Sequence, residues 1–349
     1  MAAFDDPAFD NHERVVFCHD AATGLKAIIA IHSTALGPAA GGTRLWSYAN
    51  DDEALHDVLR LAQAMSYKNA MAGLKFGGGK AVLIRTPDFA GTDAVFERYG
   101  AFVDKLNGDY VTAEDVGMSV DIMKKVARST KYVAGLPPQA GKAGGDPSPN
   151  TAFGIFKGIE SAVQFKLGED SVAGLKVAVQ GAGNVGYHLC KLLHEAGASL
   201  IIADIDAERV RRVTDELGAS NVPIDEILVQ KVDVVAPCAL GAIINERSIS
   251  ALETTIIAGG ANNQLATSED GQRLHEAGIL YAPDYVINSG GIINVASEYF
   301  GDATEAEVVE RTAQIGPRLT RIFEESAASD RPTNVVADEM ARKLIADAA

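Results

Sequence analysis

The sequence predicts an α/β protein of two domains, on three observations. A length of 349 residues is typical of two domains. From residue 176 onward, short apolar runs alternate with helical stretches, as in a parallel sheet covered on both faces. A Pro/Gly-dense stretch over 134–150 separates this half from an N-terminal half that lacks a clear βαβ rhythm. We therefore expect one domain over 1–147 and a second over 148–330, separated by a cleft, and a C-terminal helix over 331–349 that packs back on the first domain.

Composition and charge exclude several classes of protein. The chain has 47% hydrophobic and 22% charged residues, the values of an ordinary globular protein. Its formal net charge of −16 argues against a nucleic-acid or anionic-membrane partner, since both attract concentrated positive charge. No apolar run approaches the length of a membrane span, and the N-terminus lacks the basic start and apolar core of a secretion signal. We therefore expect a cytoplasmic protein.

The cysteines indicate neither a disulfide framework nor a metal site. Cys18, Cys190 and Cys238 are widely spaced and form no CxxC pair. A free buried thiol is the simplest interpretation of each, and no metal is expected.

Periodicity and turn residues predict the individual elements. In the first half we expect, in order, a hairpin over 14–32, a loop of small residues over 36–44, a helix over 53–68, a strand over 80–84, a helix over 93–106, a strand over 110–112 and a helix opened by Ser119. In the second half we expect strands over 176–180, 200–204, 232–236, 255–258 and 280–282, with closing helices over 305–326 and 334–348.

Two lysines bracket a glycine-rich segment of the first half, Lys68 and Lys80. Lys68 lies three residues past Met65, on the inward apolar face of its helix. A buried ammonium is unfavourable unless an anion meets it, so snorkelling or a structural salt bridge is the ordinary interpretation. Lys80, however, follows three consecutive glycines at 77–79, which let another group approach the backbone closely. A second amine at such a gap favours a site over a surface.

A glycine motif in the second half is typical of dinucleotide binding. Gly181-Ala182-Gly183-Asn184-Val185-Gly186 directly follows the strand expected over 176–180 and opens a helix. Gly181 permits a tight turn, Gly183 lets the backbone approach a pyrophosphate, and Gly186 lets the helix press on the sheet. The helix N-terminus favours the negative charge. A tight turn without a nucleotide, and a flavin or S-adenosylmethionine ligand, are the alternatives.

The next strand indicates which dinucleotide is bound. It ends at Asp204, where a carboxylate can accept hydrogen bonds from both ribose hydroxyls and repels a 2′-phosphate. Arg209 lies five residues further on, in the next expected helix. NAD is therefore favoured over NADP.

Several other segments have ordinary interpretations when each is taken singly. Asp115 can cap the helix that begins nearby, Asn262 can be a turn residue, and Arg44 can be a structural ion-pair partner. Together they carry a resemblance that runs nearly end to end. The motifs are Gly-Pro-Ala-Ala-Gly-Gly-Thr-Arg (37–44), Tyr-Lys-Asn-Ala (67–70), Gly-Gly-Gly-Lys (77–80), Thr-Ala-Glu-Asp-Val-Gly (112–117), Ala-Pro-Cys-Ala-Leu-Gly (236–241), Ala-Asn-Asn-Gln-Leu (261–265) and Tyr-Ala-Pro-Asp-Tyr-Val-Ile-Asn (281–288). In these motifs the chain resembles the amino-acid dehydrogenases of the glutamate/leucine/phenylalanine/valine family, and within it the leucine enzymes most closely.

The resemblance implies a Rossmann-type NAD-binding domain and reversible oxidative deamination of an L-amino acid. Lys68 matches the lysine that holds the substrate carboxylate, and Lys80 matches the catalytic lysine, whose neutral amine activates water. A nearby ammonium and poor solvation both lower a lysine pKa, so two converging lysines suit that role. Asp115 matches the carboxylate that moves protons to and from the substrate nitrogen. Asn262 matches a residue that places the nicotinamide and substrate, and Thr151 begins the cofactor domain.

The resemblance also implies an apolar substrate. Glutamate enzymes have a lysine immediately before the pair Gly41-Gly42, where this chain has Ala40, so a buried glutamate side chain would lack a partner. We expect the pocket to be lined by residues at Ala40, Gly41, Gly42, Ala113, Ile292 and Val295. Leucine enzymes usually carry leucine in place of Ala40, and phenylalanine enzymes tend to carry glycine in place of Ala113. Leucine, isoleucine and valine are the expected substrates, with phenylalanine or methionine as alternatives.

The resemblance also implies an oligomeric assembly, and two other functions remain as alternatives. The family forms homo-oligomers, so an octamer or a dimer is expected. A nucleotide-sensing protein without turnover is a second hypothesis, but it has no use for a proton-transferring pair. A 2-hydroxy-acid dehydrogenase is a third, but it uses a histidine, and none of the seven histidines lies in an obvious strand-end setting.

Overall fold

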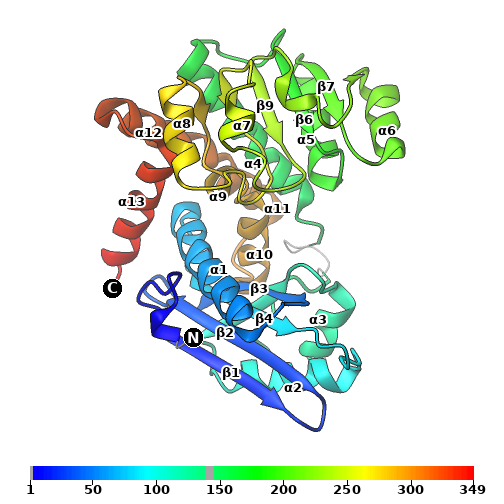
Figure 1. Ribbon diagram of the computed structural model, residues 1–349, viewed down its shortest axis with the longest axis vertical. Helices are drawn as coiled ribbons and strands as arrows, with labels where there is room; N and C mark the ends of the chain where they lie inside the picture. The colour runs from blue at the N-terminus through cyan, green and yellow to red at the C-terminus, as the bar shows by residue number, and fades with distance from the viewer. Residues whose placement is uncertain (1–2, 138–144) are drawn as a thin grey trace. The chain divides into compact units, whose positions relative to one another are not determined.

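The computed structural model describes residues 3–137 and 145–349 (Figure 1). The chain forms two compact units. The first comprises Met1–Gly145, Val295–Glu305 and Ala341–Ala349, and the second comprises Asp146–Asn294 and Ala306–Met340. This division differs from the predicted domains, because 295–305 and only the last part of the C-terminal helix belong with the first unit. Residues 138–144 of the predicted linker lie outside the described residues.

The first unit is built on a five-stranded mixed sheet. Its strands are β1 (Arg14–Asp20), β2 (Leu25–Ser33), β3 (Ala39–Trp46), β4 (Gly77–Ile84) and β5 (Tyr110–Glu114), in the order β1-β2-β4-β3-β5. β1 and β2 form the predicted antiparallel hairpin. β3 pairs in parallel with both β4 and β5. The expected loop over 36–44 is therefore wrong from Ala39 onward, and the first half does contain a βαβ crossover.

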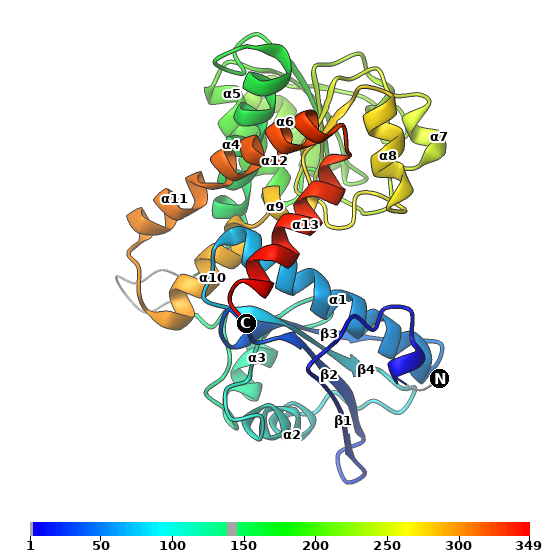
Figure 2. The same cartoon turned by 90° about the vertical axis from the view of Figure 1, so that its left-hand side faces the viewer.

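Helices cover both faces of this sheet (Figure 2). α1 (Asp51–Ala72) packs on one face, where Leu55, Val58 and Leu59 meet Ile28 and Val82. Its ends are defined by the Asn50 side chain, which accepts from the Glu53 amide, and by Gly73 in the left-handed conformation. α2 (Asp93–Asp104) and α3 (Val120–Val126) pack on the other face against the alternate residues of β2.

The second unit is built on a six-stranded parallel sheet, as predicted. The strands are β6 (Lys176–Gln180), β7 (Ser199–Ala203), β8 (Ser220–Asn221), β9 (Val234–Pro237), β10 (Ile256–Ile257) and β11 (Leu280–Tyr281), in the order β11-β10-β9-β6-β7-β8. The short edge strand β8 had no signal in the sequence. The helices are α4 (Ser148–Leu167), α5 (Asn184–Glu195), α6 (Ala207–Leu217), α7 (Glu246–Ile249), α8 (Glu269–Glu276), α9 (Asp284–Ile287), α11 (Glu305–Ala313) and α12 (Ile315–Ser329), with a 3-10 turn at Ile227–Val229. A further 3-10 turn, at Ala3–Asp5, belongs to the first unit.

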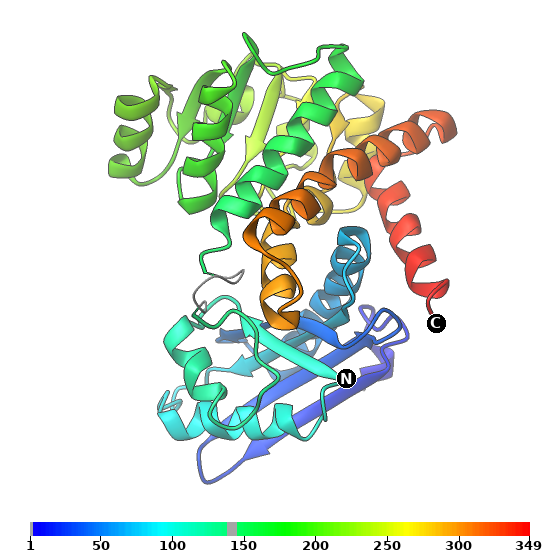
Figure 3. The same ribbon diagram turned by 180° about the vertical axis from the view of Figure 1, so that it is seen from behind.

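Two further helices, α10 (Gly290–Phe300) and α13 (Thr333–Ala346), carry several residues of each unit, and the first residue of α11, Glu305, also belongs to the first unit. The helix expected over 305–326 is divided at Gln314 into α11 and α12. α12 lies along α4 (Figure 3) because Gly154 and Gly158 leave room for Ile315 and Leu319. Within the described residues, no helix is long and apolar enough to cross a bilayer, and no cluster of three His, Cys, Asp or Glu side chains is arranged to hold a metal ion.

Candidate active site

The structure joins the buried Lys80 and the half-buried Asp115 in an ion pair. Lys80 lies on β4 with 6% of its surface exposed, and its Nζ is 2.8 Å from Asp115 Oδ2. Asp115 directly follows β5, and β3 runs between β5 and β4. A Cβ on Gly42 of β3 would lie only 2.8 Å from Asp115 Cβ, so glycine at this position lets Asp115 come close to β3. The interpretation of Asp115 as a helix cap is wrong, since Ser119 caps α3.

Burial and charge act against each other on this pair. Burial is the largest influence on Lys80 and lowers its pKa, Asp115 opposes that shift, and the net pKa lies below the ordinary lysine value. For Asp115, burial acts to raise the pKa, but Lys80 and Arg44 outweigh it and hold the pKa below the ordinary carboxyl value. The arrangement supplies an ionised carboxylate beside an amine that loses its proton more readily than a solvated lysine.

A cation that assists this shift is Arg44, on the neighbouring strand β3. Arg44 is the cation among the leading influences that lower the Lys80 pKa. Its Nε lies 3.2 Å from Asp115 Oδ2, and its Nη1 lies 2.9 Å from Asp57 Oδ2. From the sequence, Arg44 was expected only as a structural ion-pair partner, and Asp57 was not singled out at all.

The three glycines before Lys80 allow close packing within the protein. A Cβ on Gly78 would lie 2.1 Å from the Ser66 amide nitrogen of α1, and one on Gly79 would lie 2.9 Å from the Tyr110 ring. The predicted close approach to this backbone is confirmed. The groups that approach are parts of the same unit, and they leave no gap over these glycines.

Lys68 lies on α1, half-buried, where this helix crosses β3 and β4. The neighbouring residue fixes that crossing: Asn69 donates from Nδ2 to Gly77 O at 2.6 Å and to Ala40 O at 3.4 Å. Asn69 is fully buried. Sequence reasoning quoted it only within a motif, although a buried amide inside a helix indicates a tertiary hydrogen bond.

Three of the four predicted pocket side chains share one apolar cluster of the first unit. Ala40 belongs to its buried part, while Ala113 and Val295 are partly buried against it. The other members are Phe76, Val111, Ala134, Ala296, Leu74 and Tyr299. Ile292 belongs to the second unit and is not part of this cluster.

The glycine turn of the second unit has the geometry that the motif predicts. Gly181 has φ +100°, in the region that favours glycine. A Cβ on Gly186 would lie 1.9 Å from Gly181 O, so only glycine lets α5 press on the turn. At Gly183 the nearest atom to such a Cβ is Arg209 Nη1 at 3.8 Å, so the space before the α5 N-terminus is open. No side chain caps α5, which leaves its first amides available to an anion.

Asp204 lies beside this turn. Its Oδ2 accepts from the Ala182 amide at 2.6 Å and its Oδ1 accepts from the Asp206 amide at 2.8 Å, which fixes the carboxylate at the end of β7. Arg209 is on α6, as expected, but its guanidinium reaches back to Gly183. The geometry fits a dinucleotide with its pyrophosphate at α5 and a ribose at Asp204.

Asn262 and Thr151 are each held by a neighbour. Asn288 donates from Nδ2 to Asn262 Oδ1 at 2.7 Å and to Gly260 O at 3.2 Å, which orients the Asn262 amide. Asn288 is buried, and in the sequence it stood out only as part of a motif. Thr151 donates to Pro147 O at 2.9 Å near the start of α4.

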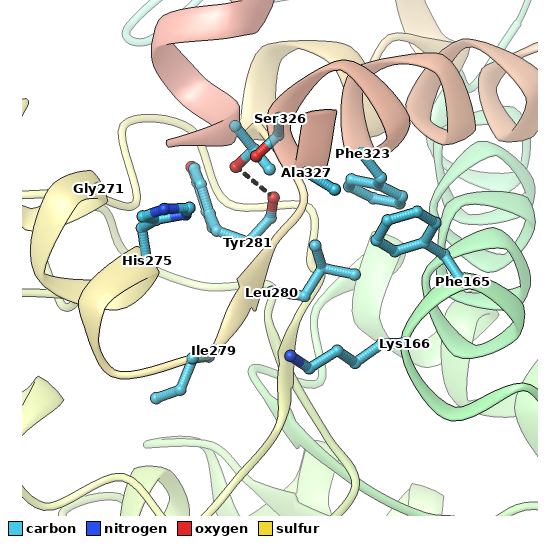
Figure 4. Close-up of a pocket in the computed structure, with 12 residues that line it drawn as sticks. Phe165, Lys166, Gly271, His275, Ile279, Leu280, Tyr281, Phe323, Ser326 and Ala327 are labelled. Atoms are coloured by element: carbon cyan, nitrogen blue, oxygen red, sulfur yellow. Dashed lines mark hydrogen bonds between the residues drawn. The ribbon is translucent and has the colours of Figure 1, made fainter. Parts of the chain in front are cut away.

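A cavity of about 180 Å³ in the second unit is lined by other residues (Figure 4). Its walls come from the end of α4, from α8, from β11 and from α12, with Phe165, Phe323 and Leu280 as apolar members. Among the described residues that line it, none is a predicted site residue. The cavity therefore gives no support to the site, which is defined by the side chains above.

Comparison with known proteins identifies the family. The family model described as "Glu/Leu/Phe/Val dehydrogenase, dimerisation domain" matches residues 12–132. The model described as "Glutamate/Leucine/Phenylalanine/Valine dehydrogenase" matches residues 146–208 and 202–344. The chain belongs to this family. It is an amino-acid dehydrogenase, and the Rossmann-type unit implies a nicotinamide cofactor.

Relatives within the family carry different substrate names. Leucine dehydrogenase of Geobacillus stearothermophilus is 49% identical over 335 residues, which cover 96% of this chain and 91% of the relative. Phenylalanine dehydrogenase of Lysinibacillus sphaericus is 42% identical over 340 residues, covering 96% and 89%. The crystal structure of L-tryptophan dehydrogenase from Nostoc punctiforme superposes with a TM-score of 0.87 at 42% identity, covering 97% of each chain.

Proposed function

We propose that this dehydrogenase catalyses the NAD-dependent, reversible oxidative deamination of an apolar L-amino acid, with leucine and other branched-chain amino acids preferred. The products are the 2-oxo acid, ammonia and NADH. The observation that carries the proposal is the ion pair of buried Lys80 with half-buried Asp115, in the unit that also holds the apolar cluster around Ala40. A polar reacting centre beside an apolar pocket suits a substrate with charged amino and carboxylate groups and an apolar side chain.

Lys80 and Asp115 divide the proton transfers of this reaction. A bound nicotinamide would supply the acceptor for the hydride that leaves the substrate Cα. The neutral Lys80 amine then accepts a proton from the water that attacks the resulting imino carbon, a step that a lowered lysine pKa favours. Asp115 is ionised and takes or returns the proton on the substrate nitrogen. Lys68 holds the substrate carboxylate and orients Cα.

The cofactor is assigned to the second unit. The turn over Gly181–Gly186 and the N-terminus of α5 hold the pyrophosphate, and Asp204 binds the adenosine ribose. Asn262, oriented by Asn288, and Thr151 serve the nicotinamide end. A carboxylate at 204 disfavours a 2′-phosphate, which supports NAD rather than NADP.

The apolar cluster accounts for the preference among substrates. Ala40 and Ala113 are small, so the wall they form admits a branched side chain and offers a substrate carboxylate no partner. Phenylalanine is the second candidate, because the same small residues leave room at that wall. We expect Ala40→Leu to shift the preference toward smaller aliphatic substrates such as valine. Unchanged relative kcat/KM values for valine, leucine and phenylalanine would contradict this assignment of the pocket.

A substrate panel tests the proposed function. The rate of NADH formation at 340 nm is measured with NAD and leucine, isoleucine, valine, phenylalanine, methionine, tryptophan or glutamate. We expect the highest kcat/KM with a branched-chain amino acid and negligible turnover of glutamate. A preference for glutamate, or turnover with NADP alone, would contradict the proposal. The match to a dimerisation domain supports a homo-oligomer, with a dimer or an octamer to be distinguished by light scattering.

A further inference from the structure

The Lys80–Asp115 pair does not stand alone. Arg44 extends from β3 and donates to Asp115 Oδ2, the same oxygen that Lys80 contacts, and its other arm reaches Asp57 on α1. The four side chains are 7–23% exposed, so solvent screens their charges only weakly. They form a continuous chain of alternating charge, Lys80, Asp115, Arg44 and Asp57.

The outer end of this chain is itself fixed. Asp57 Oδ2 accepts from Tyr48 Oη at 2.8 Å as well as from Arg44, and its Oδ1 accepts from Arg60 Nη2 at 2.7 Å. Both oxygens of Asp57 are therefore occupied, and Arg44 is held by a carboxylate at each end of its guanidinium. Such a fork restricts Arg44 to one orientation.

We propose that Arg44 and Asp57 are positioning residues of the reaction. Arg44 orients the Asp115 carboxylate. The positive charge of Arg44 favours loss of the proton from Lys80, and the negative charge of Asp57 favours its retention. The inference rests on the proposed roles of Lys80 and Asp115. It assigns a function to two residues that otherwise serve only to join β3, β5 and α1.

The opposite bias follows from the charges around Lys80. Asp115 comes from the end of β5, Arg44 from β3, and Asp57 from α1, which also carries Arg60 and Lys68. After burial and Asp115, the Arg44 charge lowers the Lys80 pKa and the Asp57 charge raises it. Arg44 also lowers the pKa of Asp115. Loss of Arg44 should therefore raise the pKa of both Lys80 and Asp115, and loss of the Asp57 charge should lower the pKa of Lys80.

The test is the pH profile of kcat/KM for oxidative deamination, which reports groups of the free enzyme. Arg44→Gln should shift the midpoint of the rising limb upward, by about half to one pH unit for a charge at this range in a partly buried site. Asp57→Asn should shift it downward. Arg44→Lys keeps the positive charge but cannot contact both carboxylates as the guanidinium does. Its midpoint should therefore lie close to that of wild type, while its kcat stays reduced. Arg98→Gln removes an ion pair with Asp20 elsewhere in the first unit and is the matched control, with no shift expected.

The outcomes separate this inference from the proposed function. A merely structural role predicts lower thermal stability and lower kcat in both variants with unshifted midpoints, which would overturn the inference. Shifts of both variants in the same direction would overturn it too. If Arg44→Gln does not fold, Asp57→Asn decides alone, because an unchanged or raised midpoint contradicts the proposal. Normal turnover by Lys80→Ala would instead refute the proposed function, whatever the profiles show.

Discussion

The two units carry proposed functional residues of different kinds. In the first unit the site consists of side-chain charges, with Lys80, Asp115, Arg44 and Asp57 in direct contact. In the second unit it consists mainly of backbone, a glycine turn and an uncapped helix N-terminus, with Asp204 tied to that backbone. The difference suits the tasks: proton transfer needs titratable groups whose pKa values can be moved, whereas holding a cofactor needs space and fixed dipoles.

The largest effect is expected from substitutions of two glycines in the second unit, Gly186, which is needed for packing, and Gly183, which we expect to contact the cofactor. Gly186→Ala places a methyl group on Gly181 O and should destabilise the protein by about 3 kcal/mol, as overpacking of a tight contact does. Gly183→Ala meets open space at a φ of −64° that alanine tolerates, so its stability should stay near wild type while its affinity for NADH falls. Urea unfolding and a fluorescence titration with NADH measure the two quantities. Equal stability of the two variants would contradict the division of roles.

The second effect sharpens the contrast, because buried titratable groups should make the first unit sensitive to acid. His32 is buried against Ser66 and His12, and burial, followed by the His12 charge, lowers its pKa to about 4. Asp10 and Arg342 are the other charged groups at this histidine. Unfolded His32 binds a proton below its ordinary value of about 6.5 and folded His32 does not, so stability falls as the pH drops from about 6.5 toward 4.

The full loss from His32 is about 3 kcal/mol, since a pKa change of this size is worth about 1.4 kcal/mol per pH unit. His32→Gln should flatten the dependence of unfolding free energy on pH across this window, whereas His19→Gln, at an exposed site on β1, should leave it unchanged. Parallel curves for the two variants would show that His32 does not carry the acid sensitivity.

The smallest effect concerns Arg209, a cation beside the glycine turn. Arg209 Nη1 lies 3.8 Å from the Cβ position of Gly183, so we expect it to attract the phosphates of the dinucleotide. Arg209→Ala should weaken NADH binding several-fold, the size of a single exposed charge contact of about 1 kcal/mol. Arg211→Ala, on the same helix and paired with Glu208, is the control. Equal affinities for NADH in the two variants would show that Arg209 does not contribute to dinucleotide binding.

The site features that could be predicted from the sequence are those of the second unit, which depend on consecutive residues. Those of the first unit depend on contacts between distant residues and could not be predicted in the same way. The roles of Gly181 and Gly186 are local, so strand, turn and helix could be read from consecutive residues. The strand β3 was missed because Gly37–Gly42 have the composition of a loop. Contacts with segments distant in the sequence explain its glycines, since a Cβ on Gly41 would meet Gly79 of β4 and one on Gly42 would meet Glu114 of β5. Arg44 could not be placed, because its partners lie 13 and 71 residues away and nothing local pairs them. The roles of Lys80 and Asp115 came from family resemblance, and the ion pair between them came from the structure.

Lys80→Ala tests the central claim most directly. Two quantities are measured on the same preparation: kcat for leucine with NAD, and the Kd for NADH by fluorescence. Because a positioned acid or base contributes about 10²–10⁴-fold, kcat should fall by that factor while the Kd stays within about twofold of wild type. Normal turnover by Lys80→Ala would contradict the account, because the reaction would then need no base at this position.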